Sequence, residues 1–155
     1  MNRRLIALLL LLMTLPACAK AYYATRREMV ERAEVIAIVD VEEIQPTSLQ
    51  GKHWTYSESA EARVVKCVKG QLPERITLLG KESFICAQVN LHRGRCLVFL
   101  KKDTPGYAGC NWRASCIPID KAGQLSWLPT PGSREVSTRV SLDRAERDIQ
   151  ADMHP

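Results

Sequence analysis

The stretch VIAIVDV (residues 35–41) decides the fold that this sequence predicts. Its residues are mostly apolar and β-branched, and they are apolar on both alternating sets of positions. A strand built from them would therefore present apolar side chains on each of its faces. Because a half-exposed strand alternates between apolar and polar residues instead, the stretch predicts a central strand that is covered on both faces.

A second stretch of the same kind follows Gly94 and reads RCLVFL (residues 95–100). Between the two, residues 59–64 alternate between apolar and polar until Val65 breaks the period, which predicts a strand with a bulge. Further strands are expected at residues 75–79, 110–119 and 125–128. Pro46 and Gly51 predict a loop or a loose hairpin connection over residues 42–56.

Helices are expected at both ends of this β-rich region. Thr25 and Glu28 have the spacing of a capping box, which predicts a short helix through about Ala33. After Pro131, apolar residues recur at helical spacing near the C-terminus, and this narrow apolar stripe predicts a helix packed on the domain. Five or six short strands with a helix at each end indicate a mainly β chain folded as a small barrel.

The N-terminus carries the pattern of an export signal. Arg3 and Arg4 precede an apolar run over residues 5–15 that is too short to span a bilayer stably, and small residues follow it. The sequence LPAC (residues 15–18) resembles a bacterial lipobox, in which Cys18 would become the lipidated first residue. Ordinary signal cleavage before Lys20 or Tyr22 is the alternative, because small residues flank those positions too.

The domain organisation expected from these features has four parts. Residues 1–17 form the signal peptide of lipoprotein type, 18–24 a tether, 25–130 the barrel domain, and 131–155 a linker with the C-terminal helix. Removing Arg3 and Arg4 with the signal lowers the formal charge of +5 by two. The charges that remain are interspersed along the chain, so we expect no nucleic-acid binding.

Five cysteines follow Cys18, namely Cys67, Cys86, Cys96, Cys110 and Cys116. In an oxidising compartment we expect them to form disulfides, and the odd count leaves at least one free or paired outside the chain. None of their spacings is that of a zinc site, so we expect no metal. No small-molecule cofactor is expected either.

Several short segments together resemble the bacterial exported proteins that have a netrin-like domain, relatives of the domain in tissue inhibitors of metalloproteinases. These are the helix that runs into residues 33–37, a strand ending in Val-Lys-Gly (68–70), Cys86, the stretch GRCLVFL (94–100), and Cys110. The resemblance implies a five-stranded OB-type barrel with flanking helices. It also implies a disulfide between Cys86 and Cys110.

The sequence departs from the family at Cys96, where an aromatic residue is more usual, and at Cys67 and Cys116. These three are expected to form a further disulfide or to remain free thiols, with the choice left open. The inhibitors of the family bind zinc through an N-terminal cysteine that early disulfides hold in place. Here Cys18 is either lipidated or removed, and no cysteine follows it before Cys67, so this mode of inhibition is not expected.

Three functional classes follow from these patterns. The first is a noncatalytic, exported and lipid-anchored envelope protein that binds another envelope protein through loops at one end of the barrel, residues 45–56 and 105–112. The second is an inhibitor of an envelope peptidase, and the third is a small enzyme that uses a cysteine with a histidine such as His92. We expect no catalytic residue. Trp112 and Trp127 are expected to cover the ends of the core, with a contact to a partner as the alternative.

The mass of the mature protein tests the export prediction. We expect a polypeptide that starts at Cys18 and carries added acyl groups, since a thioether-linked lipid with a second chain holds a small domain on a membrane. Intact-mass spectrometry of protein isolated from the envelope measures this directly. An unmodified chain that starts at Lys20 or Tyr22 would contradict the lipid anchor but not export, and an uncut leader would contradict both.

Overall fold

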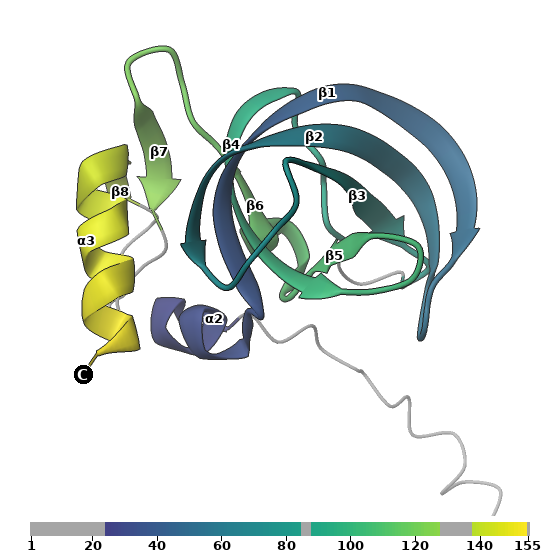
Figure 1. Cartoon of the computed structure of the whole chain (residues 1–155), viewed down its shortest axis with the longest axis horizontal. Coiled ribbons are helices and arrows are strands. Elements are labelled where there is room, and N and C mark those ends of the chain that lie inside the picture. The colour runs from purple at the N-terminus through teal and green to yellow at the C-terminus, as the bar shows by residue number, and fades with distance from the viewer. Residues whose placement is uncertain (1–23, 85–87, 128–137, 155) are drawn as a thin grey trace, which may run out of the picture.

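The computed structural model describes residues 24–84, 88–127 and 138–154. Figure 1 shows a curved sheet closed into a barrel, with both helices gathered on one side of it. The elements in chain order are α2 (Arg26–Arg32), β1 (Val35–Gln50), β2 (Thr55–Lys69), β3 (Arg75–Glu82), β4 (Gly94–Lys102), β5 (Tyr107–Gly109), the short 3₁₀ helix η1 (Trp112–Ser115), β6 (Cys116–Pro118), β7 (Gln124–Trp127), β8 (Thr138–Ser141) and α3 (Leu142–Met153).

The main sheet has the strand order β1-β2-β3-β5-β4-β6, and β1 also pairs with β4. This extra pairing closes β1, β2, β3, β5 and β4 into a ring, and β6 lies beside β4. All pairs are antiparallel except β3 with β5. The prediction of a small five- or six-stranded OB-type barrel with a helix at each end is therefore confirmed.

The N-terminal helix begins at the predicted capping box. The Thr25 backbone N–H donates to Glu28 Oε2 at 2.8 Å, and the Glu28 backbone N–H donates to Thr25 Oγ1 at 3.3 Å. These two bonds satisfy amides that a helix start otherwise leaves unpaired. Arg26 then joins α2 to α3, because its guanidinium contacts Asp152 at 2.6 Å and Asp148 at 3.3 Å.

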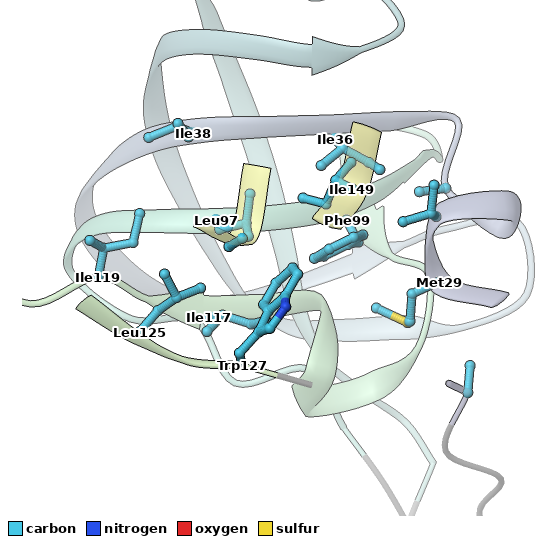
Figure 2. Packing of buried hydrophobic residues seen from close by; sticks show 14 residues of the cluster. Met29, Ile36, Ile38, Leu97, Phe99, Ile117, Ile119, Leu125, Trp127 and Ile149 are labelled. Atoms are coloured by element: carbon cyan, nitrogen blue, oxygen red, sulfur yellow. The ribbon is translucent and has the colours of Figure 1, made fainter. Parts of the chain in front are cut away.

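The strands β1 and β4 are covered on both faces, as the sequence predicts. They pair from Val35 opposite Leu100 to Val41 opposite Gly94. One set of their side chains faces the barrel interior with apolar residues of β2 and β3. The other set, which includes Ile36 and Phe99, packs beneath the two helices and β7. Figure 2 shows this outer cluster, in which Ile149 of α3 lies over Ile36 and Phe99.

Of the two alternatives for residues 42–56, the loop is wrong and the hairpin is confirmed, although it is longer and more regular than expected: β1 continues to Gln50, β2 starts at Thr55, and the two strands pair antiparallel up to the turn. The pairing of β1 with β4 ends at Val41, so the later part of β1 pairs with β2 alone. Pro46 has no backbone N–H, and a strand tolerates such a residue where one edge has no ladder partner. Register shifts on either side of Pro46 provide the local irregularity.

The predicted bulge at Val65 is confirmed. Ile38 pairs with Lys66 and Val39 pairs with Val64, so Val65 is the extra residue on β2. Its side chain is 42% exposed. The bulge increases the local twist of β2, which helps a sheet to bend into a barrel.

The expected strand over residues 110–119 is largely wrong, because only Cys116–Pro118 forms a strand there and η1 precedes it. The strand expected at 125–128 is confirmed as β7, although Leu128 lies outside the described residues. Its partner β8 was not predicted. Trp127 is 2% exposed and donates its indole N–H to Asp148 Oδ2 at 2.9 Å, so its expected place in the core is confirmed.

Two glycines with positive φ, one packed against backbone and one in open space, allow the cost of a close backbone approach to be measured. Gly70 (φ 76°) ends β2, and a Cβ there would lie 2.5 Å from the Glu34 carbonyl oxygen, whereas at Gly94 (φ 88°) a Cβ would meet nothing within 4 Å. We expect Gly94→Ala to lower the free energy of unfolding by about 1 kcal/mol from backbone strain alone. Gly70→Ala adds a collision with backbone and should lower it by about 3 kcal/mol.

Urea denaturation of the two variants measures this difference, provided that the slope with denaturant stays unchanged. Equal losses at the two positions would contradict the close approach of Gly70 to Glu34.

Candidate functional site

A groove of about 330 Å³ opens at the end of the barrel that is away from α3. Figure 1 shows the β1–β2 turn, the end of β3 and the β4–β5 loop together at this end. Both loops that the sequence nominates for binding, residues 45–56 and 105–112, contribute to the groove. Its lining residues are Glu34, Lys52, His53, Trp54, Tyr56, Glu82, Lys101, Lys102, Asp103, Ala108, Gly109, Cys110 and Trp112.

Three aromatic side chains meet at the groove. Phe84 stacks on Trp112 with ring centroids 5.0 Å apart and an interplanar angle of 22°. Trp54 lies 5.5 Å from Phe84 and 6.4 Å from Trp112. All three are half-buried, so each still presents ring surface to solvent. We call these residues the aromatic triad; aromatic surface of this kind is common where proteins bind partners.

Trp112 holds its place at some cost to the backbone. Its φ is +48°, in the left-handed region that bulky residues rarely adopt. The neighbouring Asn111 is fixed on both sides, because its Oδ1 accepts from Ala24 N at 3.0 Å and its backbone N–H donates to Ser115 Oγ at 2.6 Å. The start of the domain therefore supports the turn that presents Trp112. Trp112 is half-buried, which agrees both with the expected cover over an end of the core and with the alternative of a contact to a partner, so this expectation stays a prediction.

Asp103 joins the two loops that form the groove. Its carboxylate accepts from the Tyr56 hydroxyl at 2.7 Å, from the Lys52 backbone N–H at 2.8 Å and from the Thr104 backbone N–H at 2.7 Å. Burial acts to raise the pKa of Asp103, but these hydrogen bonds and the nearby His53 hold that pKa below its ordinary value. The β1–β2 turn is thus anchored to the segment after β4 by one carboxylate.

The other two acidic groups of the groove are also engaged within the protein. Glu82 is 3% exposed and accepts from the Val89 backbone N–H at 2.7 Å. Its burial raises the pKa of the carboxyl, against the effect of that hydrogen bond. Glu34 accepts from the Lys102 backbone N–H at 3.1 Å.

The lysines of the groove differ from its acids. Lys52, Lys101 and Lys102 are exposed, and none of their ammonium groups has a carboxylate partner among residues 24–84, 88–127 and 138–154. The groove therefore offers unpaired positive charge beside an aromatic surface. Of these features the sequence indicated Trp112 and the loop of residues 45–56, which carries Trp54 and Tyr56; it singled out neither Phe84 nor Asp103 nor the lysines.

A second cleft of about 440 Å³ lies between β2 and α3. Its walls include Lys66 and Glu146, whose charged groups lie 2.6 Å apart. Cys67 also lines it, and burial raises the pKa of this thiol. Since much of its charge is already paired, this cleft is the weaker candidate for a binding site.

The cysteines for which the sequence predicted a role do not lie together in one site. Cys18 and Cys86 lie outside the described residues, so the lipid attachment and the Cys86–Cys110 disulfide stay predictions. The four described cysteines are all free thiols. Cys67 is exposed, Cys110 lines the groove with its Sγ 3.8 Å from Met29 Sδ, and Cys96 and Cys116 are buried together in the barrel. Burial raises the pKa of Cys110 to about 11.

The histidines are not gathered with these thiols. His53 lines the groove, and Cys96 contacts His92 through the backbone oxygen of His92, at 3.4 Å, and not through its imidazole. Within the part of the chain that the structure describes, there is no group of three or more His, Cys, Asp or Glu side chains that could hold a metal ion. The same part contains no helix that is long and apolar enough to cross a membrane.

Comparisons with known proteins give no neighbour for this chain: no protein-family model matches it, and neither a curated protein nor a solved structure matches it significantly. The netrin-like resemblance therefore stays a prediction.

Replacing Tyr56 tests the anchor at Asp103. Tyr56→Phe removes one of three donors, so we expect the pKa of Asp103 to rise. In the native protein this pKa lies below its unfolded value, so Asp103 stabilises the fold at pH values above the unfolded pKa, and this contribution is lost as pH falls through the native pKa. As pH falls through this range, the free energy of unfolding should therefore decrease less in the variant than in the native protein.

NMR titration of the Asp103 carboxyl carbon and urea denaturation between about pH 2 and 6 measure the two effects. Tyr107→Phe is the matched control, because Tyr107 is half-buried and no hydrogen bond of its hydroxyl is present among the described residues. An Asp103 pKa that is the same in both variants would show that Tyr56 does not hold this carboxylate.

Proposed function

We propose that this protein is a noncatalytic binding module of the bacterial cell envelope, exported and anchored by lipid at Cys18. Its groove binds an acidic segment of another envelope protein that also carries apolar or aromatic side chains. The observation that carries this proposal is that exposed lysines without carboxylate partners among the described residues line one groove together with Trp54 and Trp112, and that Phe84 stacks on Trp112 beside it. Fold alone gives weak support for function, so the argument rests on the chemistry of the groove.

Charge complementarity selects the acidic partner. Asp103 accepts three hydrogen bonds within the chain and Glu82 is buried, so these two acids offer little to a ligand, whereas Glu34 is exposed and accepts one backbone N–H. Lys101 and Lys102 follow each other at the end of β4, and their ammonium groups have no carboxylate partner among the described residues, so the three N–H donors of each can meet a carboxylate of a ligand. A bound acidic segment would meet cations at the rim and aromatic rings beside them, an arrangement typical of specific interfaces.

The expected anchor places such a partner near the membrane. The tether of residues 18–24 can extend by at most about 25 Å. A barrel held by lipid at Cys18 therefore remains within reach of proteins of the same membrane surface. This supports an envelope protein as the partner over a soluble one.

Site-specific crosslinking tests the proposed binding. A photoreactive residue at His53, which is exposed and lines the groove, should crosslink an envelope protein in intact cells, and the crosslinked segment should be acidic. The same photoreactive residue at Val65, exposed on the bulge of β2, is the positional control. In a Lys101→Glu, Lys102→Glu background we expect the yield at His53 to fall at least about tenfold, because opposing charges become like charges.

Lys121→Glu is the charge control and is compared with the single change Lys102→Glu, because Lys121 is exposed in the turn between β6 and β7, outside the groove lining. Synthetic peptides of the captured segment, followed by the tryptophan fluorescence of Trp54 and Trp112, then give its affinity at low and high salt. Crosslinking to segments without acidic residues, or equal yields in the two charge-reversed proteins, would contradict the proposal. Inhibition of an envelope peptidase by the purified protein would replace it with the inhibitor hypothesis.

A further inference from the structure

Two of the three cysteines that the sequence left unassigned lie on neighbouring strands. Cys96 is in β4 and Cys116 is in β6, and these strands pair antiparallel with Val98 opposite Cys116 and Cys96 opposite Pro118. Residues two apart on a strand share a face, so both cysteines point to the same side of the sheet. That side is the barrel interior, where Cys96 is 0% exposed and Cys116 is 3% exposed.

The two thiols meet inside the barrel. A hydrogen bond between the two thiols is the largest cause of the raised pKa of Cys96 and of the lowered pKa of Cys116. Cys96 Sγ also lies 3.4 Å from the His92 backbone oxygen, and Cys116 makes a backbone hydrogen bond with His92. The other described cysteines have different neighbours. Cys67 Sγ lies 3.3 Å from the backbone oxygens of Lys69 and Gly70, and Cys110 Sγ faces Met29.

We propose that Cys96 and Cys116 form a disulfide that ties β4 to β6. Their strands hold the two residues as diagonal neighbours on one face, where Cα atoms lie about 7 to 8 Å apart. Because a disulfide usually spans less than about 7 Å, closing the bond draws β4 and β6 slightly together. The oxidant is an external disulfide, which the two thiols reduce by exchange. Two S–H bonds break and one S–S bond forms between Cys96 and Cys116, while the external disulfide takes up two electrons and two protons and leaves as two thiols.

This pairing fits the count of cysteines. Of the five that follow Cys18, it uses Cys96 and Cys116 and takes no partner from the Cys86–Cys110 bridge that the family resemblance implies. Cys67, the exposed one, is then the single cysteine without a partner in the chain. An odd count requires at least one such residue.

The burial of the two cysteines also determines which comes first, oxidation or folding. The attacking species in exchange is a thiolate, and the hydrogen bond between the two thiols raises the pKa of Cys96 and lowers the pKa of Cys116, so Cys116 is the attacking thiol. In the folded protein, however, an external disulfide has to reach side chains that are almost fully buried. The bond therefore forms while β4 and β6 are still accessible, before the core closes.

Peptide mapping without reduction tests the pairing directly, because tryptic cleavage places each of the five cysteines in a separate peptide. The full chain is refolded from denaturant with glutathione disulfide, quenched in acid, alkylated and digested. We expect peptide 96–101 to be joined to peptide 114–121 with the loss of two hydrogens. Refolding with excess reductant should give both peptides alkylated and separate, and Cys67→Ala should leave the link unchanged.

Other results of the map would overturn the proposal. These are a link from Cys96 or Cys116 to any other cysteine, and separate alkylated peptides after oxidative refolding. A kinetic experiment compares two rates of disulfide formation. In one sample the chain is first refolded with reductant and then oxidised, and in the other it is oxidised while it refolds from denaturant. We expect the link to form at least about tenfold more slowly in the first sample. Equal rates would overturn the proposed order of oxidation and folding.

Thermal unfolding gives a second, independent readout. It is measured in a Cys110→Ala background so that a bridge to Cys110 does not contribute. We expect reduction to lower the unfolding temperature by about 10 °C. Adding Cys96→Ala should abolish this sensitivity to reductant, whereas adding Cys67→Ala should retain it. Full sensitivity in the chain that lacks Cys96 would overturn the proposal.

Discussion

The structure depends on one constraint, which is that β1 and β4 are apolar on both faces and pair with each other. Their pairing closes the ring, and the interior then covers one face of each strand with side chains of β2 and β3. The second face needs a cover from outside the sheet. Met29 of α2, Ile149 of α3 and Trp127 of β7 provide it. Each large apolar side chain so buried contributes about 1.5 to 3 kcal/mol, which explains why elements from both ends of the chain gather there.

Much of this arrangement could be predicted from local sequence. Residues 35–41 and 95–100 identified the two central strands. Val65 marked the bulge of β2, and Thr25 with Glu28 marked the start of α2. The misses share a physical cause. Pro46 and Gly51 are loop formers by local preference, but pairing with β2 overrides that preference along a strand edge that tolerates proline. The strand β5 has only three residues, so its pattern is too brief to recognise, and only its pairing with β3 and β4 defines it.

The site could be predicted only as far as its loops. Residues 45–56 and 105–112 do meet at one end of the barrel, and Trp54 and Trp112 come from them. Phe84 and Asp103 were not foreseen, because their roles depend on contacts with residues far away in the sequence. Phe84 lies 5.0 Å from Trp112, and Asp103 accepts from the Tyr56 hydroxyl. No local pattern encodes which lysines keep a carboxylate partner, since that outcome is decided by the whole folded surface.

The strand β4 links the barrel interior to the groove. Cys96 lies near its start inside the barrel, and Lys101 and Lys102 lie at its end on the groove wall. Within the described chain β4 pairs with β1, β5 and β6, so its position is fixed from both sides. Asp103 follows directly and holds the β1–β2 turn. A groove built on such a strand is already formed before a ligand arrives, so little ordering entropy is lost on binding. The barrel thus holds the exposed lysines and the aromatic triad on one rigid support, and the proposed binding depends on this arrangement.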